Sequence, residues 1–125
     1  MDSPNYAAAP RFGRAAISTA DTSRTAPAAA GTVLTAGADG SVIDQVIVHA
    51  TGTTTAGMVR LFIHDGTNYS LIKEVPVEAR IPGASVPAFA VALDMDGYQI
   101  PTGHSLRATT HNAEAFTVTA SGADL

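Results

Sequence analysis

The residues of this chain best suited to metal binding or acid–base chemistry are four histidines, His49, His64, His104 and His111. Imidazole nitrogens bind transition metals, but a metal site needs three or four ligands close together. No two of these histidines have the H-x-x-x-H spacing, and the chain contains no cysteine that could complete a site. Metal-binding jelly rolls usually take two histidines and a carboxylate from one strand and its following turn, and that local cluster is missing. We therefore expect no metal and no other cofactor.

The acidic residues do not form a catalytic pattern either. The segment Asp94-x-Asp96-Gly97 resembles the start of a calcium-binding loop, but the downstream oxygen ligands are absent and Asp-Gly is a common turn dipeptide. A glycoside hydrolase would need paired carboxylates together with aromatic residues that stack on sugars, and only 6% of the chain is aromatic, with no tryptophan. There is no Gly-x-Ser-x-Gly motif and no phosphate-binding glycine loop. The sequence predicts that the protein is not an enzyme.

The composition indicates one small domain with an unusually uncharged surface. The chain has 125 residues, of which 24 are alanine, 15 are threonine and only 14% are charged, against about 25% in an average globular protein. A net charge of −4 with Lys73 as the single lysine argues against a nucleic-acid-binding protein. No apolar run approaches the ~18 residues of a membrane span, and the N-terminus lacks the pattern of a signal peptide. We expect no membrane partner and folding in a cytoplasm.

Residues 1–13 are predicted to form an extended N-terminal arm, and residues 14–125 a single β-sandwich domain. Pro4 and Pro10 disfavour a helix in the arm. Isolated aromatic residues are costly to leave in water, so we expect the arm to attach to a neighbouring subunit. The alternative is an unattached chain end. The candidate anchors for the partner are Tyr6, Phe12 and Ile17.

Short runs rich in β-branched residues, separated by turn residues, predict about eight strands and no amphipathic helix. This pattern is typical of an antiparallel β-sandwich or jelly roll. The segment Asp94–Gly97 is predicted to be a turn between two strands. The predicted strands are 14–22, 32–36, 41–51, the two arms of a hairpin over 57–77, then 88–94, 104–110 and 115–120, with a short extended segment at 98–100.

The hairpin GMVRLFIHDGTNYSLIKEVPV, residues 57–77, is predicted to be the centre of the fold. A three-residue loop with Asn68 in the left-handed conformation would place Arg60 opposite Glu74 and Phe62 opposite Ile72. The inner face would then hold Val59, Leu61, Ile63, Leu71 and Val75. Apolar groups framed by charges on the outer face suggest a subunit contact, unless a loop of the same chain covers them. The candidate contact residues are Met58, Arg60, Phe62, Ile72 and Glu74.

Two segments carry a resemblance to a known family. The hairpin phrase LFIHDGTNYSLIKEVPV and the C-terminal segment IPTGHSLRATTHNAEAFTVTASGADL, together with the extended arm, resemble small β-sandwich proteins of tailed-bacteriophage structural modules. The resemblance covers about residues 30–125. It implies a capsid cement (decoration) protein that binds the major capsid protein on the outside of the virion as a homo-oligomer, often a trimer, and is assembled in the cytoplasm of the host bacterium.

Two alternatives from other functional classes stay open at the level of sequence. One is a trimeric head-fibre, tail or receptor-binding β-module, which would bind a host glycan or protein. The other is a carbohydrate-binding sandwich or a cupin-like enzyme. The leading hypothesis is a non-enzymatic virion structural protein that stabilises contacts between major capsid subunits.

Overall fold

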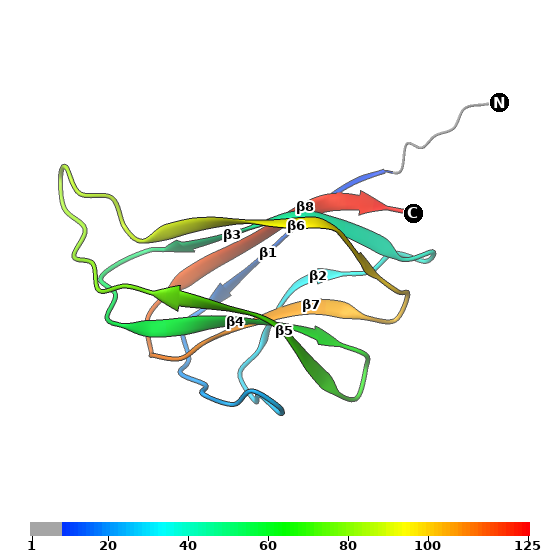
Figure 1. The fold of residues 1–125 in the computed structure, drawn as a ribbon, viewed down its shortest axis with the longest axis horizontal. Coiled ribbons are helices and arrows are strands. Elements are labelled where there is room, and N and C mark those ends of the chain that lie inside the picture. The colour runs from blue at the N-terminus through cyan, green and yellow to red at the C-terminus, as the bar shows by residue number, and fades with distance from the viewer. Residues whose placement is uncertain (1–8) are drawn as a thin grey trace.

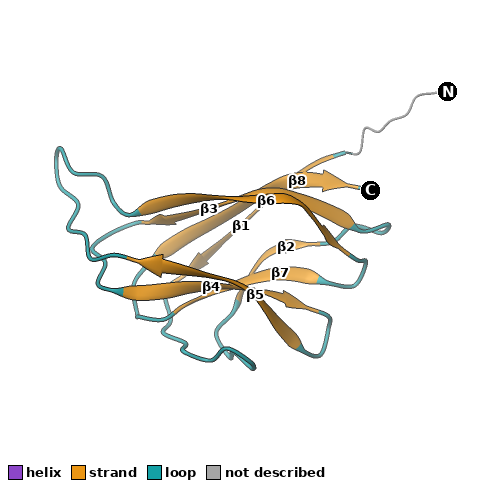
Figure 2. Ribbon diagram, in the orientation of Figure 1, coloured by secondary structure: helices purple, strands orange, loops and turns teal. Residues whose placement is uncertain are grey.

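The computed structural model describes residues 9–125, which form eight antiparallel strands in two four-stranded sheets packed as a sandwich (Figure 1). Within these residues the chain consists of strands and loops (Figure 2), and no helix is long and apolar enough to cross a membrane. The strands are β1 (Pro10–Ile17), β2 (Gly31–Thr35), β3 (Ser41–Ala50), β4 (Gly57–His64), β5 (Tyr69–Val77), β6 (Ala90–Ile100), β7 (Ser105–Thr110) and β8 (Phe116–Asp124).

The strand order is that of a jelly roll, as the sequence predicted. The first sheet has the order β1-β8-β3-β6 and the second has the order β2-β7-β4-β5. Four of the pairings are nested, because β4 pairs with β5, β3 with β6, β2 with β7 and β1 with β8. Every connection except the β4–β5 hairpin crosses from one sheet to the other. A long hairpin folded over on itself gives this topology.

Alternation of side chains along the strands, shifted by bulges in β3 and β5, places the apolar residues between the sheets. In β3, Val46 and Val48 are fully buried, and their neighbours Ile47 and His49 are exposed. The predicted inner face of the hairpin is confirmed for Val59, Leu61 and Val75, which are buried, and for Ile63, which packs at the margin of the core. It is wrong for Leu71, which lies opposite Phe62 on the outer face. The bulge in β5 turns Ile72 toward the core instead, although the sequence predicted it on the outer face. The centre of the core is formed by Ile43, Val46, Val48, Val59, Leu61, Leu106, Phe116 and Val118.

The structure differs from the sequence prediction at the boundary between arm and domain. β1 begins at Pro10, so the boundary expected after residue 13 falls inside a strand that pairs with β8. Arg11 explains part of this early start. Its guanidinium donates to Asp124 Oδ1 at 2.6 Å and to the Thr35 carbonyl at 2.8 Å. The Ser41 hydroxyl donates to the same carboxylate oxygen, also at 2.6 Å, so one carboxylate joins β1, β3 and β8.

A second difference lies in β6. The segment Asp94–Gly97 was predicted to end a strand, but β6 runs through it without interruption. Asp96 and Gly97 have φ values of +52° and +69°, and the Asp96 N–H donates to Asp94 Oδ1 at 2.9 Å. The turn geometry therefore exists, but it forms a bulge whose flanking residues both pair with β3. Pairing with β3 on both sides of the segment makes it a bulge and not the end of a strand, and no local sequence pattern reveals that pairing.

One side of the sandwich is closed by direct contact between β1 and β2, while β5 and β6 on the opposite side are hardly in contact. The approach of β1 to β2 requires glycine at position 13. A Cβ atom there would lie 2.1 Å from the Val33 carbonyl oxygen, which is far inside van der Waals contact with backbone.

We therefore predict that Gly13→Ala destabilises the fold by about 1–3 kcal/mol, the usual cost of overpacking, or more. Urea denaturation followed by circular dichroism measures this free energy of unfolding. Gly52→Ala is the matched control, because no atom lies within 4 Å of the Cβ position there. Equal stability of the two variants would show that β1 and β2 are not in this close contact.

Candidate functional site

The outer face of the second sheet is covered by a loop of the same chain, residues 18–30, which connects β1 to β2 below β4 and β7 in Figure 1. Ala20 forms a parallel bridge with Thr110, and the Asp21 N–H donates to the Thr110 carbonyl at 2.8 Å. Arg24 reaches Glu74 on β5. The sequence analysis left two possibilities for this face, a subunit contact or cover by the same chain. The structure shows that the same chain covers the centre of this face.

Asp21 organises the covering loop. Its Oδ2 atom accepts the N–H groups of Ala28 and Ala29 at 2.7 and 2.8 Å, and its Oδ1 atom accepts that of Ser23 at 3.1 Å. Partial burial of the carboxyl would raise its pKa, but these hydrogen bonds and the nearby Arg60 guanidinium outweigh that effect and lower the pKa of Asp21. The loop is therefore held as a folded unit by a charged carboxylate.

The hairpin register confirms one predicted pair and corrects another. Arg60 lies opposite Glu74 as predicted, but Phe62 lies opposite Leu71, because the register shifts between Leu61 and Phe62. The loop also differs. It has four residues, Asp65–Asn68, and the left-handed residue is Gly66 at φ +99°, not Asn68. Asp65 Oδ1 accepts the N–H groups of Thr67 and Asn68, and a bulge in β5 restores the pairing of opposite charges.

The predicted outer-face residues are less exposed than a contact surface requires. Arg60 is 1% exposed and Phe62 is fully buried, where its ring meets Tyr69 edge-on at 5.8 Å. Met58 and Ile72 are half-buried, and the Glu74 side chain is 33% exposed. The expectation that Arg60 and Phe62 contact a partner directly is wrong, because residues 18–30 and the neighbouring strands bury both side chains.

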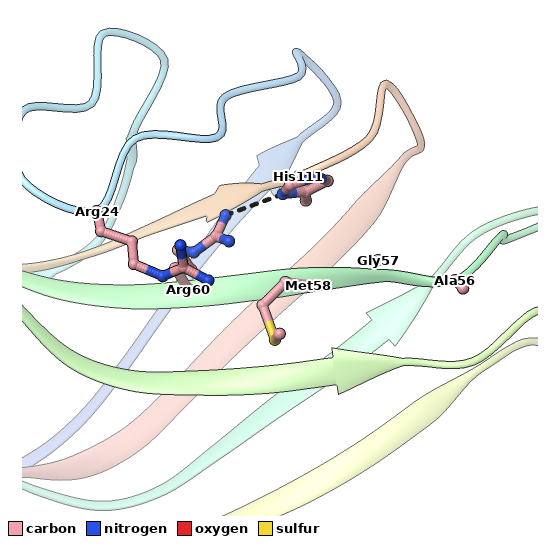
Figure 3. Close-up of a pocket in the computed structure, with 6 residues that line it drawn as sticks. All are labelled: Arg24, Ala56, Gly57, Met58, Arg60 and His111. Carbon is pink, nitrogen blue, oxygen red and sulfur yellow. Dashed lines mark hydrogen bonds between the residues drawn. The ribbon is translucent and has the colours of Figure 1, made fainter.

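A shallow pocket of about 200 Å³ lies beside the buried arginine, lined by Arg24, Ala56, Gly57, Met58, Arg60 and His111 (Figure 3). The Arg60 Nη1 atom lies 3.2 Å from His111 Nδ1, which places the proton of a neutral imidazole on Nε2. Arg60 Nε and Arg24 Nε both donate to Glu74 Oε2, at 2.8 and 2.6 Å. The two guanidinium charges are balanced by Glu74 and Asp21, so the pocket has little net charge. The ion pair of Arg24 with Glu74 beside the pocket joins the covering loop to β5.

The four histidines have different surroundings. His49 faces outward from β3, His64 packs on Tyr69 with ring centroids 4.3 Å apart, and His104 lies within 3.2 Å of the Thr102 carbonyl. Among residues 9–125, no group of three or more histidine, aspartate or glutamate side chains is placed to hold a metal ion.

The predicted arm residues fall into three different situations. Tyr6 lies outside the described residues. Phe12, the second of the three predicted anchors, is 66% exposed on the outer face of β1. Ile17 is 5% exposed and belongs to the core, so its assignment as an anchor for another subunit is wrong. Its side chain points between the sheets because it lies an odd number of residues from Phe12.

The outer face of the first sheet is the surface that sequence reasoning missed. The pairing of the four strands places three rows of residues on it, and none of these residues is buried. Two carry a full charge, Arg14 near one edge and Asp94 near the other. The period-2 pattern of Thr117, Thr119 and Ser121 was a signal for this face. The rows are Phe12–Ser121–Gln45–Asp94, Arg14–Thr119–Ile47–Ala92 and Ala16–Thr117–His49–Ala90.

Comparisons with known proteins identify no relative. No protein-family model, no curated protein and no solved structure matches this chain.

The ion-pair network predicts a dependence of stability on pH. Hydrogen bonds from Arg24 and then from Arg60 lower the pKa of Glu74 from its ordinary 4.5. A carboxyl with a lowered pKa stabilises the fold above its ordinary pKa, and this contribution is lost as the pH falls through the folded-state value. We expect the melting temperature of the unmodified protein to fall by several °C below about pH 4.5. We also expect Glu74→Gln to lower the melting temperature at pH 7, because buried Arg60 loses its counter-charge.

Glu78→Gln is the matched control, since Glu78 pairs with Arg80 on the surface, where ion pairs contribute little. Calorimetry on both variants checks the prediction. Equal melting temperatures at pH 7 would contradict a stabilising role for the network.

Proposed function

We propose that this protein is a non-enzymatic structural protein of a virion. It binds the outer surface of a phage capsid and stabilises contacts between major capsid subunits. The observation that carries the proposal is the outer face of the first sheet, a four-stranded surface on which half of the twelve residues are alanine, threonine or serine and only two carry a full charge, with Phe12 exposed at its β1 edge. The resemblance of the hairpin and of the C-terminal segment to tailed-phage β-sandwich proteins supports it.

The chemistry of this face suits a protein partner. A surface with few charges loses little hydration free energy when a second surface covers it, and small side chains allow close approach. The other sheet cannot offer such a surface, because residues 18–30 and the Arg24–Glu74–Arg60 network occupy it. A partner of this face needs a flat, mostly neutral surface, and a capsid shell presents the same surface in many copies.

The binding of many copies makes modest contacts sufficient. Burial of one phenylalanine side chain contributes ~1.5–3 kcal/mol, roughly a ten- to hundredfold change in a binding constant. In the trimer expected from the resemblance, three linked copies would bind together, and the binding of the whole trimer would be stronger than that of one copy. Arm residues before β1, including Tyr6, would add to the same contact because the chain enters the sheet next to Phe12.

The test is co-sedimentation of the purified protein with capsids that lack it. Phe12→Ala should weaken binding by roughly tenfold or more without changing stability, because Phe12 is exposed in the unbound protein. Ile81→Ala is the matched control, an exposed apolar residue in the β5–β6 loop at 77% exposure. Loss of binding in the control alone, or full binding by Phe12→Ala, would contradict this proposal.

Electron microscopy of virions distinguishes the alternative functions. A capsid cement protein should appear in many copies across the shell. A few copies at one vertex or on the tail would favour a head-fibre, tail or receptor-binding module instead.

A further inference from the structure

The two sheets have four edge strands, and three of these carry features that discourage pairing with another chain. β1 is packed against β2, which is only five residues long and contains a register shift. β5 carries Pro76, Lys73 and a bulge. Proline, lysine, bulges and short length are the common protections of a sheet edge. The exception is β6, an 11-residue strand whose first half, Ala90–Asp94, pairs regularly with β3 and contains no proline, lysine or bulge.

The direction of the backbone groups in this segment follows from one hydrogen bond. The Ala50 N–H donates to the Phe89 carbonyl at 2.7 Å, so Phe89 points its carbonyl toward β3. Directions alternate along an antiparallel strand. Val91 and Leu93 therefore also point their backbone groups toward β3. The N–H and C=O groups of Ala90, Ala92 and Asp94 point to the open edge, and β6 pairs with no other strand among residues 9–125.

Side chains on the same edge are incompletely covered. Val91, Leu93 and Met95 belong to the margin of the core but remain partly exposed, because β5 and β6 are hardly in contact on this side of the sandwich. In Figure 1 the β5–β6 connection extends beyond the end of the sheets and leaves the edge of β6 free. An unpaired strand edge thus coincides with half-buried apolar side chains.

We propose that two copies of this chain associate through antiparallel pairing of β6 with β6 of the second copy, centred on Ala92. The contact joins the two first sheets into one continuous sheet of eight strands. It concerns the chain on its own and does not depend on the proposed capsid role.

The sequence of the edge is complementary to itself in this register. Ala92 faces Ala92 of the second copy, and each Ala90 faces the other copy's Asp94. All three residues with free backbone groups are then satisfied, which gives six hydrogen bonds between the copies. Val91 lies across from Leu93 of the second copy on the core side, so the partly exposed apolar side chains cover one another.

Charge and the number of hydrogen bonds together favour the same register. Centred on Ala92, the two Asp94 residues are separated by four residues along the strand, about 14 Å, which exceeds the Debye length of about 10 Å at 0.1 M salt. Centring on Leu93 would halve that separation and lose two hydrogen bonds, and centring on Val91 would also lose two. Beyond Asp94, the left-handed backbone of Asp96 and Gly97 ends the regular edge. These features favour a closed dimer over an open chain of copies.

The test is sedimentation equilibrium of the 125-residue protein over a range of concentrations. We expect a monomer–dimer equilibrium. Ala92→Pro removes both central N–H donors of the dimer but none that the monomer uses, so it should raise the dissociation constant by roughly tenfold or more. Ala92→Lys gives a second variant, because it places two like charges directly opposite each other in the dimer but leaves the exposed monomer edge intact.

Ala84→Pro and Ala84→Lys are the matched controls, since Ala84 is exposed in the turn between Gly83 and Val86. They should dimerise like the unmodified chain. Amide hydrogen exchange adds a readout of register, in which the N–H groups of Ala92 and Asp94 become protected as concentration rises. A monomer at every concentration, or a trimer that Ala92→Pro and Ala92→Lys leave intact, would overturn the proposal.

Discussion

The closure of only one side of the sandwich is the constraint on which the other features of this protein depend. β1 meets β2 where Gly13 lets the backbones approach, and a side chain there would strike the Val33 carbonyl. Because the other side stays open, the residues of β6 that border it are only partly covered. Between them, Ala90, Ala92 and Asp94 point their backbone groups to the open edge, where no other strand among the described residues pairs with them. The same asymmetry thus stabilises the jelly roll and leaves one edge able to bind another strand.

The two outer faces of the sandwich differ in a way that separates structural from interacting surface. The second sheet is covered by residues 18–30, which Asp21 holds in shape and which Arg24 joins to Glu74. A buried arginine such as Arg60 is tolerated only when its charge is balanced, and Glu74 provides that balance. Nothing comparable lies on the first sheet within residues 9–125. Its outer face, with few charged residues and many small ones, remains available, which is why the proposed function is placed there.

The sequence predicted most of the fold but less of the surfaces. Alternation in residues 115–120 was sufficient to identify a strand and its inner face, because burial on one side imposes a period of two. The β-branched residues at 41–51 identified a strand, but not its inner face, because a bulge between Ile43 and Gln45 shifts the alternation. Opposite charges correctly aligned Arg60 with Glu74. The prediction failed at Asp94–Gly97 and at Pro10–Gly13, where turn and arm signals are real but pairing with β3 and β8 overrides them. Phe62 was assigned to an exposed face because no local pattern shows that a distant loop will cover it.

The amino-acid sequence by itself determined the class of structure: an antiparallel sandwich of about eight strands, with its core residues and its low charge. Those properties depend on neighbouring residues and on the repeat of two, which can be read along the chain. Tertiary structure alone decided which faces are free. Whether a strand face is covered depends on segments separated by 50 residues, as Arg24 and Glu74 are. It likewise decided that β6 lies at an open edge, because strand order arises from contacts between distant parts of the chain.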